Sequence, residues 1–128
     1  MRPVYILIVE DHQAVREAMT DGLTRAGFTV RGASTIEEAR TLLFTDKLPF
    51  TAIALDHKIG SDNTETFVRE VRESGFTGLI LGMSLEMELS IRIERAAYQA
   101  GGEGHTLSVE KLEAVDVLRK ILAPCQDE

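Results

Sequence analysis

The fold is set by the stretch Val4-Tyr5-Ile6-Leu7-Ile8-Val9-Glu10-Asp11, in which six apolar residues run directly into two acids. A second stretch repeats the pattern, because the run Phe-Thr-Ala-Ile-Ala-Leu at residues 50–55 is followed by Asp56. Short apolar runs of this kind are typical of strands buried on both faces of a parallel sheet. If the two strands are neighbours, Glu10, Asp11 and Asp56 converge at their carboxyl ends, where open α/β sheets place their ligand sites.

Three carboxylates at one edge of a sheet predict a site for a hard divalent cation. Carboxylates held together repel one another unless a cation neutralises them, and their oxygens are ligands that suit Mg²⁺. A carboxylate next to such an ion can also attack a phosphoryl group. The pattern therefore indicates a candidate aspartyl-phosphate site.

Strand and helix patterns alternate along the whole chain, and each is bounded by capping or turn residues. After the first strand, the sequence predicts a helix through Val15, Met19, Leu23 and Ala26 capped by Gly27, then a short strand at 28–30 and a helix opened by the capping-box pattern Ser34-Thr35-Ile36-Glu37. The strand before Asp56 comes next, followed by a helix through Phe67, Val68 and Val71 that closes at Gly75 and a strand at 79–83 ended by Ser84. The remaining elements are a helix at 86–99, a weak strand at 105–107 and a final amphipathic helix from Leu112 to Leu122. Five strand-helix units with short connections predict a doubly wound five-stranded parallel sheet with helices on both faces.

Length and composition fit one compact domain. A chain of 128 residues that is 44% hydrophobic supports a single core, which we expect to span residues 1–123, with 124–128 as a tail or truncated linker. The net charge of −7 and the absence of a Lys/Arg run argue against direct binding to nucleic acid or a membrane surface. The first apolar run is too short to span a membrane. The sole cysteine, Cys125, allows no internal disulfide, which fits a cytoplasmic location.

Over almost its whole length, the chain resembles the receiver domain of two-component response regulators, the CheY-like family. Residues 6–12, Ile-Leu-Ile-Val-Glu-Asp-His, look like the family's first strand and acidic pair, and residues 15–17 continue the likeness. Asp56 falls at the phospho-acceptor position, and Ser84 falls at the hydroxyl position that ends the fourth strand. Residues 100–102 look like the small-residue turn before the fifth strand. The resemblance implies the flavodoxin-like arrangement of the receiver fold.

The resemblance also implies a signalling module that is not an enzyme. Asp56 would accept a phosphoryl group from a histidine kinase or phosphotransfer protein. Mg²⁺ would be held by Asp11, Asp56 and the backbone carbonyl of Lys58, and Glu10 would act through water. The hydroxyl of Ser84 would then hydrogen-bond the phosphate.

Receivers transmit this change through a ring on the fifth strand and the helices beside it. His105 stands nearest the ring position, although a packing role suits it better. The corresponding output face here comprises residues 86–99, His105 and residues 109–122, and a dimer or partner should use it.

One residue of the family pattern is missing, namely the lysine that follows the fifth strand. An ungapped alignment puts Ser108 there, whereas an alignment that starts the last helix at residues 108–112 shortens the lysine loop. Neither alignment recovers a lysine, and Lys111 would have to reach back across a turn. Leu85 also replaces a very small residue beside the phosphate position. We therefore expect weak or atypical switching, with a phosphorylation-independent interaction module, a pseudo-receiver, as the alternative.

Lys58 has three roles open to it. It could fold over the carboxylates and replace the missing cation, remain a solvated loop lysine, or pair with Glu10 or Glu86 and keep the pocket metal-free.

His12 and His57 each follow a pocket acid, which raises the possibility of imidazole metal ligands. Adjacent residues of a strand point in opposite directions, so we expect both histidines to lie outside a shared ligand set. The glycines at 101, 102 and 104 precede the weakest strand and form no phosphate cradle. A dehalogenase-like phosphatase is disfavoured because its second acid would fall at Lys58.

Overall fold

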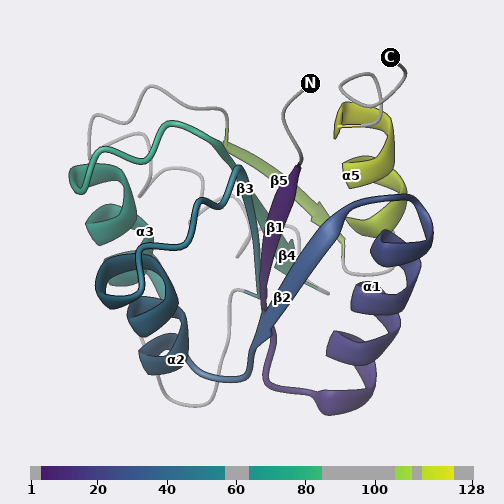
Figure 1. Cartoon of the computed structure of the whole chain (residues 1–128), viewed down its shortest axis with the longest axis horizontal. Helices are drawn as coiled ribbons and strands as arrows, with labels where there is room; N and C mark the ends of the chain where they lie inside the picture. Colours follow the sequence, from purple (N-terminus) through teal and green to yellow (C-terminus); the bar gives the residue numbers. More distant parts are fainter. Residues whose placement is uncertain (1–3, 57–63, 85–105, 111–113, 123–128) are drawn as a thin grey trace.

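The computed structural model describes residues 4–56, 64–84, 106–110 and 114–122, which form one parallel sheet with helices on both of its faces (Figure 1). The elements follow the chain as β1 (Tyr5–Val9), α1 (Gln13–Arg25), β2 (Thr29–Ala33), α2 (Ile36–Arg40) continued by the π-helical turn η1 (Thr41–Thr45), β3 (Ala52–Asp56), α3 (Thr64–Glu73), β4 (Leu79–Ser84), β5 (Thr106–Glu110) and α5 (Ala114–Leu122). The strand order is β2-β1-β3-β4-β5, and every neighbouring pair is parallel. The predicted fold class is confirmed.

This strand order has a functional consequence. The chain runs from β1 outward to β2 and then returns to β3 on the other side of β1. Doubly wound sheets bind their ligands outside the carboxyl ends of the strands at such a reversal, which here are the ends of β1 and β3. β1 is followed by Glu10 and Asp11, and β3 ends in Asp56.

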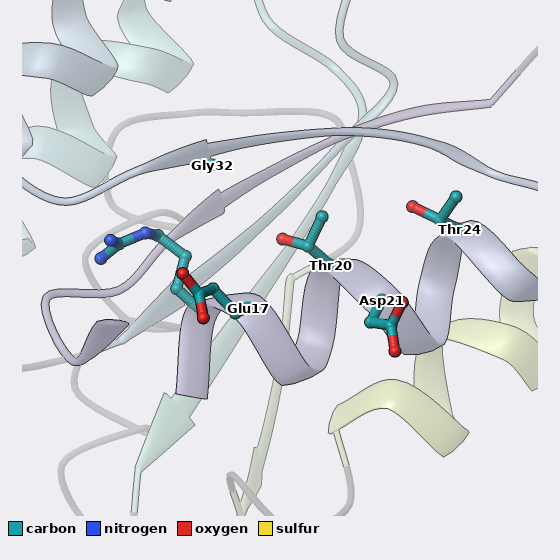
Figure 2. Close-up of a pocket in the computed structure, with 6 residues that line it drawn as sticks. Glu17, Thr20, Asp21, Thr24 and Gly32 are labelled. Carbon is teal, nitrogen blue, oxygen red and sulfur yellow. The ribbon is translucent and has the colours of Figure 1, made fainter. Parts of the chain in front are cut away.

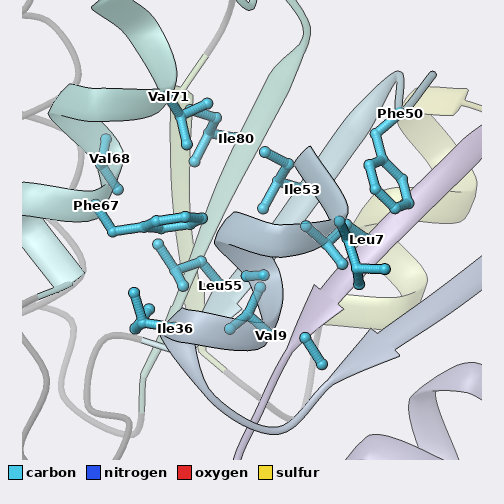
Figure 3. Packing of buried hydrophobic residues seen from close by; sticks show 13 residues of the cluster. Leu7, Val9, Ile36, Phe50, Ile53, Leu55, Phe67, Val68, Val71 and Ile80 are labelled. Carbon is cyan, nitrogen blue, oxygen red and sulfur yellow. The ribbon is translucent and has the colours of Figure 1, made fainter. Parts of the chain in front are cut away.

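The sheet separates two apolar cores because alternate residues of a strand face opposite sides. Leu7, Val9, Ile53 and Leu55 belong to the core under α2 and α3, where Phe67 fills the centre (Figure 3). The intervening strand residues belong to the core under α1 and α5, with Met19, Leu23 and Leu118 from the helices: these strand residues are Ile6, Ile8, Ala52 and Ala54. Both faces of the inner strands are therefore buried, as their unbroken apolar runs predict.

Two helix ends follow their predicted capping signals. Gly27 lies just past α1 and Gly75 just past α3, and each has a φ of 99°. This left-handed conformation strains residues with a Cβ, so glycine is favoured at both positions.

Several boundaries differ from the prediction. β2 extends to Ala33 rather than ending at residue 30, because all five of its residues pair with β1. The second helix is capped by Thr35, one residue later than predicted: its Oγ1 accepts from the Glu38 N–H at 3.0 Å. Glu38 in turn accepts from the Ser34 N–H at 2.8 Å, so the capping box is present but shifted.

The last strand also lies later than predicted. β5 runs from Thr106 to Glu110, whereas the sequence predicted residues 105–107. The alignment that began the final helix at residues 108–112 is wrong, because Ser108 and Glu110 pair with β4.

Some predictions fall outside the described residues. These are the loop at 58–63, the helix at 86–99, and the tail at 124–128. Within the part of the chain that the structure describes, no helix is long and apolar enough to cross a membrane.

Candidate functional site

β1 and β3 bring two buried carboxylates together at the carboxyl edge of the sheet. Val9 pairs with Leu55, so the next residues, Glu10 and Asp56, lie side by side at a strand spacing of about 4.8 Å. Asp56 continues the α1/α5 face of β3, since Ala54 two residues earlier belongs to that core. Glu10 is 0% and Asp56 1% exposed. We call the carboxyl edge formed by Glu10, Asp11 and Asp56 the acidic edge.

Asp11 is the solvent-facing member of the acidic edge. Its side chain is 32% exposed, whereas that of Glu10 is fully buried. Asp11 leaves β1 beyond Glu10 and precedes the N-cap of α1. Asp11 is therefore the acid of this edge that is most accessible to solvent.

His12 joins this group, contrary to the sequence expectation. Its Nδ1 lies 3.4 Å from Glu10 Oε2 and 3.3 Å from Asp11 Oδ1, and its backbone N–H donates to Glu10 Oε2 at 3.1 Å. Donor atoms of Glu10, Asp11 and His12 all lie within 4.8 Å of one another. The expectation rested on the alternation within a strand, but β1 ends at Val9, and the chain turns into α1 over residues 10–12. The side chain of His12 is nevertheless 72% exposed, as expected of a surface residue.

The strand that carries Ser84 lies next to β3. Met83 pairs with Asp56, so Ser84, the last residue of β4, stands one residue beyond Asp56 on the neighbouring strand. Ser84 pairs in turn with Glu110, the last residue of β5. Glu110 is a strand-end acid that sequence reasoning missed, because the weak fifth strand was placed too early. The sequence signal for it was the alternating segment Thr-Leu-Ser-Val-Glu at 106–110.

The expectation that no lysine follows the fifth strand rested on a strand placed too early: β5 ends at Glu110, so the next residue in the sequence is Lys111, and the final helix begins only at Ala114. Ser108 pairs with Gly82, two residues before the edge, and β5 ends in Glu110. The other residues discussed for this site, His57, Lys58, Leu85, His105 and Lys111, lie outside the described residues.

The donor set suits a hard cation. Glu10, Asp11 and Asp56 offer carboxylate oxygens, which are preferred by Mg²⁺. Glu10 and Asp56 are both buried at the ends of neighbouring strands, where an opposite charge would stabilise them. The residues present therefore fit a magnesium site.

A comparison of the chain with known protein families agrees with this geometry. A model described as the response regulator receiver domain matches residues 6–123. The chain belongs to the response regulator receiver domain family. Receivers of two-component systems interact with histidine kinases or phosphotransfer proteins and with output domains, and they typically bind Mg²⁺ in an acidic pocket. A search of curated proteins found no match.

Solved receiver structures share the fold at low sequence identity. The chemotaxis protein CheY4 of Vibrio cholerae is 23% identical, with a TM-score of 0.75, over 96% of this chain and 98% of that one. A CheY-like receiver domain from Methylobacillus flagellatus is 20% identical, with a TM-score of 0.77, over 98% and 100% of the two chains. A two-component response regulator from Clostridium difficile is 20% identical, with a TM-score of 0.74, over 97% and 99%.

Proposed function

We propose that this receiver is a cytoplasmic signalling module, not an enzyme, that accepts a phosphoryl group on Asp56 from a histidine kinase or phosphotransfer protein. One observation carries the proposal: β1 and β3 place Glu10 and Asp56 side by side at the switch point of the sheet, next to Asp11. This combination provides a nucleophilic carboxylate and the oxygen ligands for the cation that phosphoryl transfer needs.

The transfer step exchanges one bond to phosphorus for another. A carboxylate oxygen of Asp56 attacks the phosphorus of the donor's phosphohistidine, the P–N bond breaks, and the imidazole leaves with the bond's electron pair. Asp11 and Asp56 would hold Mg²⁺, together with the backbone carbonyl of Lys58, and Glu10 would act through water. Bound Mg²⁺ supplies charge neutralisation for the phosphoryl oxygens. Asp56 is buried, which excludes bulk water from the nucleophile.

Ser84 is our candidate for the group that responds to the phosphate. It ends the strand next to Asp56, where a hydroxyl can hydrogen-bond a phosphoryl oxygen. We further propose that the output surface includes α5, whose Asp116, Arg119 and Lys120 are exposed, and that a partner or a second copy docks there.

We propose weak or atypical switching, because the last residue of β5 is an acid, Glu110, and no lysine precedes Lys111 on this strand. Glu110 pairs with Ser84 and ends the strand that lies two strands from that of Asp56. A negative charge near the phosphate opposes its accumulation, and each tenfold loss of rate or of bias between states corresponds to about 1.4 kcal/mol.

Placing a lysine on β5 tests this explanation. Glu110→Lys should increase the rate of phosphorylation by acetyl phosphate, because it replaces a negative charge with a positive one at the edge. Ser108→Lys, at the position given by the ungapped alignment, should have less effect because Ser108 lies two residues before the edge. A larger gain from Ser108→Lys than from Glu110→Lys would count against this account of the edge.

The same charge pattern favours a second candidate function, a pseudo-receiver that binds a partner without phosphorylation. Intact-mass analysis after treatment with Mg²⁺ and acetyl phosphate separates the two, with Asp56→Asn as the matched control. A phosphoryl adduct on the wild type that is absent from the control supports the leading proposal. If a purified histidine kinase that phosphorylates other receivers and acetyl phosphate both leave the mass unchanged, the pseudo-receiver is favoured.

A further inference from the structure

The backbone of Glu10 is held on both sides. Its N–H donates to the Ala33 carbonyl of β2 at 3.0 Å. Its carbonyl accepts from Arg16 Nη1 at 2.8 Å. Arg16 lies in the first turns of α1, so the guanidinium ties the helix back to the residue at which the chain leaves β1. Few side chains are long enough and carry a donor that can close such a contact across six residues.

Arg16 reaches this carbonyl by lying across Gly32 of β2. A Cβ at position 32 would stand 3.1 Å from the Cδ and 3.2 Å from the Cγ of Arg16, closer than ordinary van der Waals contact. Figure 2 shows Gly32 on β2 above the part of α1 that carries Glu17, Thr20 and Thr24. Arg16 and Gly32 line a pocket together with these three residues and Asp21.

The backbone conformation does not explain the glycine at position 32. Among the described glycines, only Gly27 and Gly75 have a positive φ, so the backbone at position 32 would accept other residues. Glycine in a strand interior weakens the strand and marks a place where another group approaches closely. Here that group is the aliphatic part of Arg16.

We propose that Arg16 is a positioning residue of the acidic edge, and that Gly32 provides the space for it. The hydrogen bond to the Glu10 carbonyl sets the direction in which the chain turns from Glu10 to Asp11. That direction determines where both carboxylates stand before a cation arrives. Ligands that are ordered in advance bind more tightly, because less conformational freedom is lost on binding. This inference rests on the proposed function, since it concerns the cation site of the same edge.

Four variants test the inference: Arg16→Met, Arg16→Lys, Gly32→Ala and the double variant Arg16→Met with Gly32→Ala. Arg25→Met is the control, because Arg25 lies on the same helix, loses the same charge and is exposed beside Asp21. The measurements are the Mg²⁺ dissociation constant from isothermal titration calorimetry and the Asp11 amide resonance of the metal-free protein. Thermal unfolding of each variant reports the stability separately.

Arg16→Met and Gly32→Ala should each weaken Mg²⁺ binding by about tenfold, as is usual when a group that orients a metal ligand is lost. The double variant should be no weaker than Arg16→Met alone, because both changes remove the same contact. Arg16→Lys should recover part of the affinity by donating to the same carbonyl. The Asp11 amide should shift in all but the control, since Arg16 polarises the peptide group to which that amide belongs.

Two results would overturn the inference. In the first, Arg16→Met and Gly32→Ala bind Mg²⁺ within twofold of the wild-type affinity and their Asp11 amide resonance does not shift. This result would count whatever the change in melting temperature. The other is a wild-type protein that binds no Mg²⁺. Additive losses in the double variant would overturn the role of Gly32. If Mg²⁺ binds as expected but Asp56 takes no phosphoryl group, the proposed function fails while the positioning role stands.

Discussion

Glu10 and Asp11 are adjacent in the chain, but the fold gives them different environments. Glu10 is buried against the sheet, with its Oε2 accepting from the His12 N–H, whereas Asp11 faces solvent. Burial restricts what can replace Glu10. Asp11 can change with little effect on packing, so it is the better residue for separating metal binding from stability.

Asp11→Asn should leave the metal-free protein as stable as wild type, within about 0.5 kcal/mol, because it removes repulsion from an exposed position. In Mg²⁺ at about one hundred times the wild-type dissociation constant, wild type should gain about 2.7 kcal/mol while the variant gains less. Urea unfolding with and without Mg²⁺ measures both quantities. Equal stabilisation of the two proteins by Mg²⁺ would place the ion away from Asp11.

Positions 78 and 75 favour glycine for different structural reasons. At Gly78 a Cβ would overlap the Thr51 carbonyl oxygen and stand 2.7 Å from Phe76 Cζ, whereas at Gly75 no atom lies within 4 Å. The carbonyl of Gly78 also accepts from the buried Arg72 at 2.8 Å. Position 78 is therefore limited by space, and position 75 by its φ of 99°.

Gly78→Ala should lower the free energy of unfolding by about 2–4 kcal/mol, because backbone must move to admit the methyl group. Gly75→Ala should lower it by only about 1–2 kcal/mol, the strain of a left-handed alanine. Urea unfolding gives both values, and an unchanged slope shows that the transition remains the same. A smaller loss at position 78 than at 75 would contradict this assignment.

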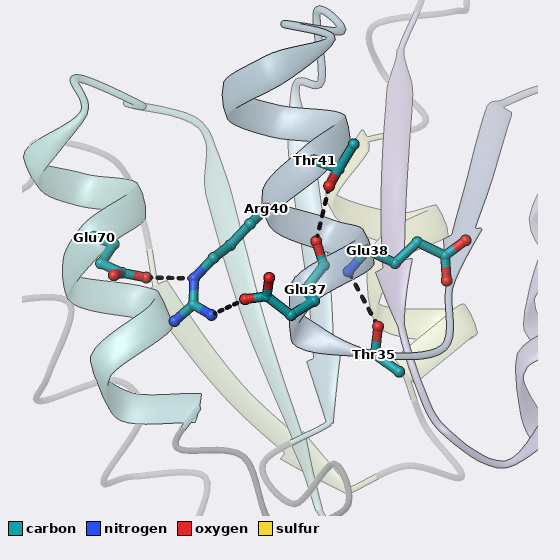
Figure 4. A network of polar contacts seen from close by, with 6 residues as sticks. All are labelled: Thr35, Glu37, Glu38, Arg40, Thr41 and Glu70. Carbon is teal, nitrogen blue, oxygen red and sulfur yellow. Dashed lines mark hydrogen bonds and ion pairs between the residues drawn. The ribbon is translucent and has the colours of Figure 1, made fainter.

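Among the elements, α2 is connected to its surroundings by polar contacts at both ends (Figure 4). Thr35 caps its first turn, and Arg40 at its end donates to Glu70 of α3 at 2.9 Å and to Glu37 at 2.7 Å. The hydrogen bond to Glu70 is the main cause that raises the pKa of the Arg40 guanidinium, opposed by burial and aided by Glu37. The contribution of these contacts of Arg40 to the free energy of unfolding is complete below the unfolded pKa of arginine, and it is lost only at strongly alkaline pH. It should be constant across neutral pH, and small because the group is about one-third exposed.

The N-cap of α2 should contribute more than that ion pair. Thr35→Ala removes the acceptor for the Glu38 N–H and should destabilise the protein by about 1 kcal/mol. Thr41→Ala is the control: its Oγ1 donates to the Glu37 carbonyl, a bond of little net value in a helix. Urea midpoints compare the two, and equal losses would mean that the hydroxyl at 35 does not act as a cap.

At the scale of the whole molecule, five strands divide the core into two layers that still belong to one sheet. Ile6 of β1 faces the α1/α5 core, and Ile80 of β4 faces the α2/α3 core. The two strands flank β3, so neither layer can unfold without breaking the pairing that supports the other. A single cooperative transition is expected.

Ile6→Val and Ile80→Val should each destabilise the protein by about 0.5–1.5 kcal/mol, because each removes one buried methylene. Their effects should add within about 0.5 kcal/mol, since the residues face opposite sides of the sheet two strands apart. Chemical unfolding followed by circular dichroism and by tyrosine fluorescence checks this. Separate transitions for the two probes would show that the layers unfold independently.

The sequence by itself determined those features that local chemistry controls. Unbroken apolar runs identified β1 and β3, because a strand covered on both faces has no polar side. Gly27 and Gly75 marked helix ends, because only glycine takes a left-handed φ without strain. The acids that follow β1 and β3 predicted the acidic edge, because parallel strands end together.

Only the tertiary structure decided which distant groups meet. The full length of β2 and of β5 depends on pairing with β1 and β4, which local patterns do not specify. His12 meets two carboxylates because the chain turns after Val9, and Arg16 reaches the Glu10 carbonyl across Gly32 of β2. These contacts join residues from different elements, and their energies depend on how the sheet and helices pack rather than on any local preference.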